Sequence, residues 1–298
     1  MPPSSHYDVA VLGGSYAGLS IAMALGRSLR KTVVIDAGRP ANRFAPAAHN
    51  VITHDGAAPD AIRREAREQV AAYGTVSFLD GTVVQVSGRD GAFTLRLKDD
   101  QRLTAAKVAL ATGVEDVLPN LEGVEAAWGK SVVHCPYCHG YEFAGRPTGI
   151  LLGGGDALEF YRLIANWTDR LTLFTGGRGD VDVAELRAAG ATVVEEPIVG
   201  LAHDDGWLRA VRLADGASVA LEALYLRPPF RQQFDAAAQL GCAVTPQGHV
   251  QVDALQATTR AGVYAAGDCA TPFRAVSVAM GQGTVAGAMI NRALVGAG

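Results

Sequence analysis

Cysteine, net charge and long apolar runs are all sparse in this sequence, and each shortage argues against a class of protein. Four cysteines in 298 residues are too few for a disulfide-stapled secreted scaffold, so we expect a reducing, cytosolic setting. A net charge of -4 gives no electrostatic reason to expect nucleic acid or an anionic membrane surface as a partner. Residues 9–26 are uncharged, but glycines interrupt them and no basic start precedes them, so we expect neither a membrane span nor a signal peptide.

What remains is an apolar, glycine-rich chain that can bury a large core. Hydrophobic residues make up 49% of it, and its length suits one large domain or two ordinary ones. The start of the chain predicts a short strand at 7–12, a Gly-rich turn, a helix from Ala17 and a second strand that ends in Asp36. The turn approximates G-x-G-x-x-G, with Ser15 at the middle position. Such a turn places helix N–H groups at a pyrophosphate, and Asp36 stands where an acid binds a ribose hydroxyl.

The same unit repeats about 140 residues later. A strand at 148–152 precedes three consecutive glycines, including Gly153 and Gly155, and a predicted helix and second strand follow. Two such units in one chain indicate two nucleotide-binding domains. We therefore expect an α/β fold built from two Rossmann-like domains.

Two further regions complete this pattern. Residues 75–113 alternate apolar and polar side chains, which predicts a small antiparallel sheet attached to the first unit and ending in Ala-Thr112-Gly113. Near the other end, a strand at 263–266 leads into Gly267-Asp268 and a helix of small residues. A carboxylate in that place suits a polyol such as a ribityl chain.

Between the two units lies a pair of thiols, Cys135-Pro-Tyr-Cys138, bracketed by His134 and His139. Four possible metal ligands stand within six positions, but the tetrapeptide equally suits a redox dithiol. Zinc is disfavoured because no second Cys-x-x-Cys or spaced His pair completes a site, so we expect no metal. A glutaredoxin is disfavoured because this dithiol directly precedes a nucleotide motif.

Thiol–disulfide exchange needs a thiolate, and a histidine suits proton transfer near neutral pH. We expect His139 or His134 to shuttle that proton; the alternative is that either one only hydrogen-bonds to backbone. Cys242 and Cys269 have no spaced partner, and we expect them to pack as small hydrophobes.

The order of these motifs along the chain resembles the low-molecular-weight thioredoxin reductase family of flavoproteins, over residues 6–295. The resemblance implies an FAD domain from residues 1–115 and 245–298, with a smaller NAD(P)-type domain at 116–244 between its halves. It implies a redox pair of Cys135 and Cys138, the second facing the flavin, and a homodimer. Carried over by position, the cofactor-binding residues are Gly13, Gly14, Ser15, Gly18, Asp36, Thr112, Gly113, Gly267, Asp268, Arg274, Ala275 and, in the second unit, Gly153 and Gly155.

Three departures from the family stand out. Ala275 follows Arg274 where the family often has a glutamine that contacts the flavin. Thr175-Gly176-Gly177 replaces a His-Arg-Arg run that pairs with the 2′-phosphate of NADPH, which leaves NADPH, NADH or neither as the open alternatives. His139 stands where an aspartate is usual, and residues 135–142 resemble the dithiol oxidases that close disulfides in gliotoxin- and holomycin-type natural products.

Three functions follow. The first is an FAD-dependent thiol–disulfide oxidoreductase, leaning to oxidation of a small dithiol by oxygen because the arginines are missing. The second is an NAD(P)H-dependent reductase of thioredoxin or a small disulfide. The third is a redox or flavin sensor without turnover.

Overall fold

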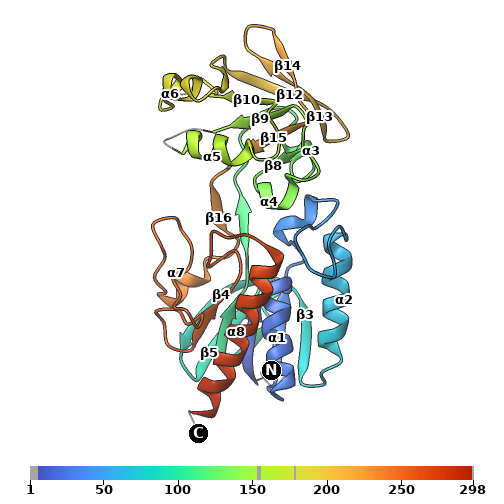
Figure 1. The fold of residues 1–298 in the computed structure, drawn as a ribbon. Coiled ribbons are helices and arrows are strands. Elements are labelled where there is room, and N and C mark those ends of the chain that lie inside the picture. The colour runs from blue at the N-terminus through green and yellow to red at the C-terminus, as the bar shows by residue number, and fades with distance from the viewer. Residues whose placement is uncertain (1–5, 153–155, 178, 297–298) are drawn as a thin grey trace. The chain divides into compact units, whose positions relative to one another are not determined.

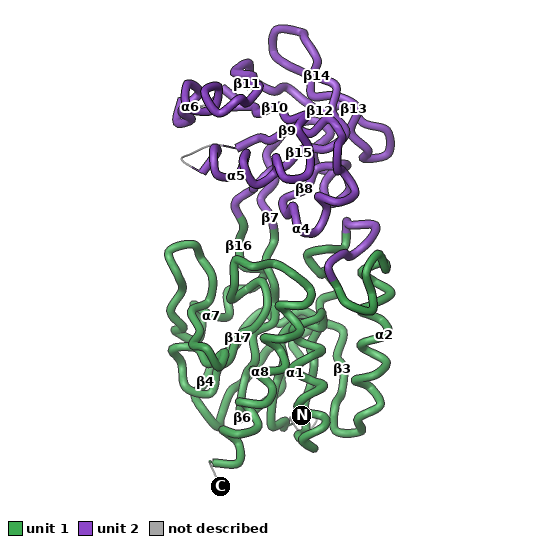
Figure 2. Tube along the Cα trace, viewed as in Figure 1, with its two compact units in different colours: residues 1–43, 51–115, 230–298 green, residues 44–50, 116–229 purple. Residues whose placement is uncertain are grey.

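The computed structural model describes residues 6–152, 156–177 and 179–296, which form two compact units. Unit 1 comprises Met1–Arg43, Val51–Glu115 and Phe230–Gly298, and unit 2 comprises Phe44–Asn50 and Asp116–Pro229 (Figures 1 and 2). The chain therefore enters unit 2 twice, once briefly and once for its main body. No helix among the described residues is long and apolar enough to cross a membrane.

Unit 1 is built on one seven-stranded sheet with the order β3-β2-β1-β6-β5-β4, and β17 also pairs with β6. β1 lies parallel to β2 and β6, and β17 lies parallel to β6. The elements in or bordering unit 1 are β1 (His6–Leu12), α1 (Tyr16–Arg27), β2 (Thr32–Asp36), η1 (Ala41–Phe44), α2 (Pro59–Ala71), β3 (Val76–Asp80), β4 (Val83–Arg89), β5 (Ala92–Leu97), β6 (Arg102–Leu110), β7 (Val114–Asp116), β16 (Phe230–Gln232), α7 (Ala236–Leu240), β17 (Val263–Ala265) and α8 (Val276–Val295).

The centre of this sheet is apolar on both faces, as parallel strands covered by helices require. β1 is fully buried from Val9 to Leu12. Helices α1 and α8 run side by side, and two glycines of α8 make the close approach possible (Figure 1). A Cβ on Gly283 would lie 2.4 Å from the carbonyl oxygen of Ala17, and one on Gly287 would lie 2.7 Å from Ala24 Cβ. The small residues near the C-terminus are thus a packing surface for α1.

The expectation of a small antiparallel sheet is wrong for its first strand and confirmed for the others. β3 pairs with β2 in parallel, so it extends the nucleotide-type sheet. β4, β5 and β6 are antiparallel as expected, and they join the first unit through β6, which makes them part of the same seven-stranded sheet. Alternation of apolar and polar residues identifies a strand, but it carries no information about which neighbour the strand joins.

Unit 2 has a parallel five-stranded sheet, β11-β10-β9-β15-β8, and a three-stranded antiparallel sheet, β12-β13-β14. Its apolar cores lie around Ile150 and Phe160 and around Trp128 and Leu208. Its elements are α3 (Val124–Ala127), β8 (Val132–Val133), α4 (Pro136–His139), β9 (Thr148–Leu151), α5 (Ala157–Ile164), β10 (Leu171–Phe174), α6 (Val183–Ala188), β11 (Thr192–Val194), β12 (Ile198–Asp204), β13 (Trp207–Leu213), β14 (Ser218–Ala220) and β15 (Ala223–Leu226).

The contact-defined units differ from the expected division at two places. The chain returns to unit 1 at Phe230, earlier than the expected 245, because α7 places Ala236, Ala237 and Leu240 in the core of unit 1. The segment Phe44–Asn50 belongs to unit 2, although it lies between β2 and α2 of unit 1.

Candidate functional site

The Gly-rich turn of unit 1 is closed tightly enough that side chains are excluded from it. A Cβ on Gly18 would lie 1.8 Å from the carbonyl oxygen of Gly13, and one on Gly14 would lie 2.7 Å from Asp36 Cβ. Gly13 has φ +109°, a conformation that favours glycine. Ser15 is the N-cap of α1, and no acidic side chain stands in the first turn of that helix. The first N–H groups of α1 therefore face a bare backbone turn, which suits an anionic phosphate.

Three segments distant in sequence meet at this turn. A Cβ on Gly13 would lie 2.2 Å from the carbonyl oxygen of Ala111, directly before Thr112 and Gly113. A Cβ on Gly267 would lie 2.9 Å from Ala17 Cβ, at the start of α1. The meeting follows from topology, because β1, β6 and β17 are parallel and end at the same edge of the sheet.

Asp36 closes one side of this edge. Its side chain is 13% exposed, accepts a hydrogen bond from the Gly38 amide at 3.1 Å and lies 3.5 Å from Arg63 of α2. Arg63 was not expected from the sequence, where no local motif marks it. It also pairs with Asp60 at 2.7 Å, and its Nε is buried with no hydrogen-bond partner among the described residues. An acid beside Gly14 is the arrangement that holds a ribose hydroxyl.

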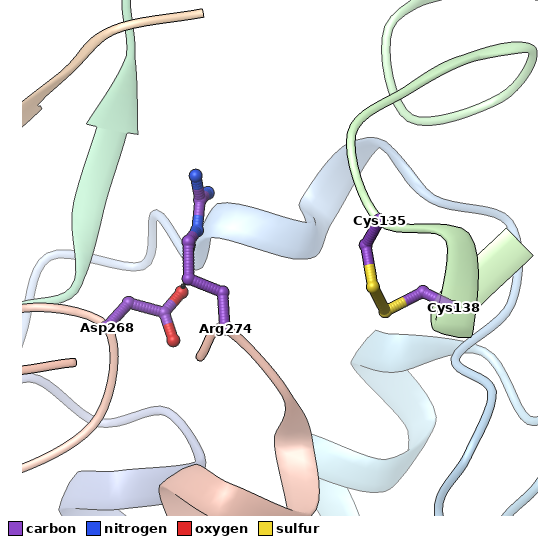
Figure 3. Close-up of a disulfide and its surroundings, with 4 residues drawn as sticks. All are labelled: Cys135, Cys138, Asp268 and Arg274. Carbon is purple, nitrogen blue, oxygen red and sulfur yellow. Dashed lines mark ion pairs between the residues drawn. A yellow bond between two sulfur atoms is a disulfide. The ribbon is translucent and has the colours of Figure 1, made fainter. Parts of the chain in front are cut away.

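The other side carries a second polar cluster. Asp268 Oδ2 lies 3.5 Å from Arg274 Nε, with both side chains largely buried (Figure 3). His249 is 4% exposed, packs on the Phe230 ring at 4.6 Å, and has a buried Nε2 with no hydrogen-bond partner in the described part of the chain. Burial and the nearby Arg274 charge lower the pKa of His249. Ala275 is the N-cap of α8.

These residues fit FAD. The glycine cradle, the acid at the end of β2 and the polar cluster at Asp268 supply a phosphate site, a ribose site and a polyol site on one edge. The orphaned His249 Nε2 and Arg63 Nε are buried polar atoms that a polar ligand would satisfy. The role of each single residue toward FAD stays a prediction.

The second strand–turn–helix motif, which lies in unit 2, carries different charges at the start of its helix. Its glycines at 153 and 155, and Arg178, lie outside the described residues. α5 begins after Asp156 and carries Glu159 in its first turn. Thr175, which follows β10, is buried and hydrogen-bonds through its backbone and side chain to the β11 region. Two nearby arginines are already engaged: Arg187 pairs with Glu195 at 2.7 Å, and Arg227 lies 4.0 Å over the Phe160 ring.

Cys135 and Cys138 form a disulfide in unit 2 (Figure 3). Cys135 is the N-cap of the four-residue helix α4, and Cys138 is the third residue of that helix. Both sulfurs belong to half-buried residues, while the flanking rings of Tyr137 and Tyr141 are 57% and 85% exposed. The disulfide is therefore partly exposed, in a turn that also carries two exposed tyrosines. No group of three or more His, Cys, Asp or Glu residues in the described ranges could hold a metal ion.

The two predicted proton carriers stand in different surroundings. His134 stacks on Trp128 with ring centroids 5.8 Å apart. His139 is the last residue of α4, and burial, aided by the charge of nearby His49, lowers its pKa from 6.5 to about 4. Whether either histidine acts in catalysis stays a prediction.

His49 and Glu142 are polar neighbours that sequence reasoning missed. His49 Nε2 lies 3.4 Å from Glu142 Oε1, and His49 comes from the segment 44–50 that joins unit 2. Glu142 also contributes to raising the pKa of Tyr225, which burial raises most. The spacing of three residues from His139 could have drawn attention to Glu142, but nothing local marks His49.

The remaining cysteines are buried and reduced. Burial, then the Asp268 charge, raises the pKa of Cys269 to about 11, and burial raises the pKa of Cys242. A thiol with a raised pKa is a poor nucleophile at neutral pH, so both behave as packing residues.

A two-unit nucleotide fold with an accessible Cys-x-x-Cys disulfide defines a class of flavin-dependent disulfide oxidoreductases. Residues 7–177 and 183–283 match the family described as pyridine nucleotide-disulphide oxidoreductase, and the chain belongs to this family. It is therefore an enzyme of the thioredoxin reductase-like fold, with FAD as its cofactor and Cys135–Cys138 as its redox disulfide.

Three relatives cover nearly the whole chain. Thioredoxin reductase sirT from Leptosphaeria maculans is 32% identical over 98% of this chain and 96% of its own. The crystal structure of an oxidoreductase from Agrobacterium tumefaciens has 38% identity and a TM-score of 0.91, covering 97% of this chain and 99% of that one. The crystal structure of HlmI has 33% identity and a TM-score of 0.92, covering 99% and 94%.

Proposed function

We propose that this enzyme oxidises a small-molecule dithiol to a disulfide, with oxygen as the final electron acceptor. The observation that carries the direction is the end of β10. NADPH-dependent thioredoxin reductases have basic residues there, whereas this chain has a buried Thr175 followed by two glycines. None of Thr175, Gly176 and Gly177 carries the guanidinium fork that selects a 2′-phosphate.

The chemistry balances without a nicotinamide. One substrate thiolate attacks the Cys135–Cys138 disulfide, and a mixed disulfide with Cys135 forms as Cys138 leaves as a thiolate. The second substrate thiol then displaces Cys135, so the substrate leaves as a disulfide and its two electrons stay on the cysteine pair. FAD, when bound, supplies the two-electron route from that pair to oxygen, and overall one dithiol and one O2 give one disulfide and one H2O2.

The surroundings of the disulfide support a small apolar substrate. Tyr137 and Tyr141 present exposed rings on either side of His139, and Tyr137 packs edge-on against Trp167 with centroids 5.8 Å apart. Exposed aromatic rings favour contact with a flat apolar molecule. HlmI, a structural relative, shares 33% of its sequence with this chain over nearly its full length.

Further parts of the proposal rest on family resemblance. The residues at 13–18, 36, 112–113 and 267–275 would hold FAD, while 116–244 would keep an altered nucleotide domain. The protein would act as a cytoplasmic homodimer on a dithiol, without nucleic acid or membrane as a partner.

The test is anaerobic flavin bleaching by NADPH, by NADH and by a small dithiol such as dithiothreitol, in separate cuvettes. We expect dithiol to bleach the flavin at least about tenfold faster than either nicotinamide, with recovery on admitting air. Cys138→Ser should abolish the dithiol reaction, because the disulfide can no longer form. Cys242→Ser removes a buried, unpaired cysteine of unit 1, should leave the reaction intact and serves as the matched control.

A second candidate is an NAD(P)H-dependent reductase of thioredoxin or a small disulfide. It is favoured by the names of several relatives, including thioredoxin reductase sirT. Rapid bleaching by NADPH or NADH would establish this function and overturn the proposed direction.

A further inference from the structure

His249 is a deeply buried polar residue in the last part of unit 1. Its side chain is 4% exposed, and its Nε2 is buried without a hydrogen-bond partner in the part of the chain that the structure describes. Its backbone is fully bonded, because its N–H donates to Thr245 Oγ1 at 3.2 Å and its carbonyl oxygen accepts from the Thr245 N–H at 2.8 Å. The Phe230 ring packs on the imidazole with centroids 4.6 Å apart. The backbone and one face of the ring are thus fixed, which gives Nε2 a defined place.

Hydrogen bonds on both sides of His249 tie it to the residue after Asp268. The Val250 N–H donates to the carbonyl oxygen of Cys269 at 2.8 Å. Gln232 Nε2 donates to two carbonyl oxygens, that of the glycine before His249 at 2.9 Å and that of Cys269 at 3.0 Å. Because Cys269 follows Asp268 directly, these bonds hold the buried imidazole at the end of the sheet edge that carries Asp268.

This place belongs to one half of FAD. Asp36, the acid expected at the ribose of the adenylate half, ends β2, whereas Asp268 follows β17. In the parallel part of the sheet, β1 and β6 lie between those two strands. Neighbouring strands are about 4.8 Å apart, so three steps separate the two acids by roughly 14 Å along the edge. His249 therefore stands at the end that would hold the ribityl polyol and the flavin ring.

The chemistry of a neutral imidazole suits this half of the cofactor. Burial and the Arg274 charge lower the pKa of His249, so at pH 7 one ring nitrogen donates and the other accepts. The hydroxyls of a ribityl chain both donate and accept, so either tautomer of His249 finds a partner there. A buried polar atom without a partner destabilises the folded chain, and a ligand that supplies the partner removes this cost.

We propose that His249 is a cofactor-contacting residue, whose Nε2 hydrogen-bonds to the ribityl–isoalloxazine half of bound FAD and increases the affinity of the protein for it. The contact adds a residue to the glycine cradle, Asp36 and Asp268. It holds whichever way the electrons flow, so the inference is independent of the proposed direction of the reaction.

Three variants separate the hydrogen bond from packing. His249→Gln puts an amide nitrogen close to the place of Nε2, whereas His249→Leu keeps comparable bulk without a polar atom. Val250→Ala is the matched control, because Val250 is the next residue, is 2% exposed and bonds to Cys269 through its backbone, which the substitution retains. Each full-length variant is studied as the holoprotein and, after removal of the flavin, as the apoprotein.

The experiment measures binding of FAD, FMN and ADP separately, because FMN contains the flavin half of the cofactor and ADP the adenylate half. We expect His249→Leu to bind FAD and FMN about tenfold more weakly in fluorescence titrations, because a buried hydrogen bond is lost. ADP affinity, measured by calorimetry, should stay at the wild-type value. His249→Gln should keep most of the FMN affinity, and Val250→Ala should keep all of it. His249→Leu should also lower the melting temperature of the holoprotein but not that of the apoprotein.

Three results would overturn the inference. Wild-type FMN affinity in His249→Leu would mean that FAD does not satisfy Nε2 and that a buried water is its partner. Equal losses of FMN affinity in His249→Leu and in either His249→Gln or Val250→Ala would assign the ring a packing role. Equal weakening of FMN and ADP would show general damage to unit 1. None of these readouts uses a dithiol or a nicotinamide, so a failure of dithiol to bleach the flavin would reject the proposed function alone.

Discussion

The chain contains two strand–turn–helix units of similar sequence, and the difference between them lies in the charge at the helix start. In unit 1, Ser15 is the N-cap of α1 and no acid stands in the first turn of that helix; the acid stands instead at the end of β2. In unit 2, α5 begins after Asp156 and carries Glu159 in its first turn. Acids at a helix N-terminus stabilise the helix itself but oppose a phosphate at the same place. A glycine motif alone therefore does not identify a phosphate site.

The largest expected effect comes from adding a side chain to the Gly-rich turn of unit 1. Gly18→Ala places a Cβ 1.8 Å from the Gly13 carbonyl oxygen, which only a backbone shift can relieve. We expect a loss of about 3 kcal/mol in stability and loss of bound flavin, since overpacking a tight site is costly. The flavin-to-protein absorbance ratio and thermal unfolding measure both.

Gly149→Ala, in β9 of the second unit, is the counterpart. Its Cβ would meet Leu221 and Leu224 side-chain carbons at 2.7 and 2.9 Å, and such side chains can move. We expect weaker destabilisation with flavin retained. Equal flavin loss in Gly18→Ala and Gly149→Ala would mean that the two units share one cofactor site. That result would contradict the difference between the two strand–turn–helix motifs.

The second effect concerns the acid after the second strand. Asp36 ends β2 in unit 1, and Thr175 follows the corresponding strand, β10, in unit 2. Asp36→Thr therefore gives the motif of unit 1 the side chain that stands in unit 2. We expect FAD to bind about 10- to 100-fold more weakly, because a hydrogen bond to a charged group contributes about 1.5–3 kcal/mol. Equilibrium titration of the apoprotein by flavin fluorescence measures the affinity. An unchanged dissociation constant would remove Asp36 from the cofactor site.

The smallest effect is a dependence of stability on pH that originates in unit 2. The pKa of His139 is about 4 in the folded state, below its ordinary value of 6.5, so the unfolded chain binds a proton that the folded chain does not. Stability is therefore full above pH 6.5 and falls as the pH drops toward 4. Because the ring is partly exposed, we expect a loss of about 1–2 kcal/mol.

His139→Gln should flatten that part of the pH profile, as measured by urea unfolding at pH 7, 5.5 and 4.5. His54→Gln is the control, since its imidazole has a different environment at the surface of unit 1. An identical slope in wild type and His139→Gln would show that the ring titrates normally in the folded protein.

Much of the fold and of the cofactor edge could be predicted from the sequence, because it depends on local signals. The strand before Gly13, the Gly-rich turn and the helix after it follow from apolar runs and glycine spacing. Thr112, Gly113 and Gly267 come to the same edge because parallel strands that cross over with a fixed hand end together. Their convergence needs only the correct order of elements.

The rest could not be predicted because it depends on partners far away in sequence. The parallel pairing of β3 with β2 leaves no trace in the alternation of β3. His49 lies in irregular chain after η1, without periodicity, and its place beside Glu142 follows from packing onto unit 2. The orphaned Nε2 of His249 likewise emerges only once Phe230 and Arg274 surround it.

The segment Phe44–Asn50 has a consequence for folding. It packs closely on unit 2, where a Cβ on Gly129 would lie 2.9 Å from Phe44 Cβ. During synthesis these residues leave the ribosome before any of 116–229, so they must wait for their partners, and their contacts have a high sequence separation. The surroundings of the disulfide are therefore completed late. A fragment limited to 116–229 would contain both cysteines and yet lack the surroundings that His49 completes.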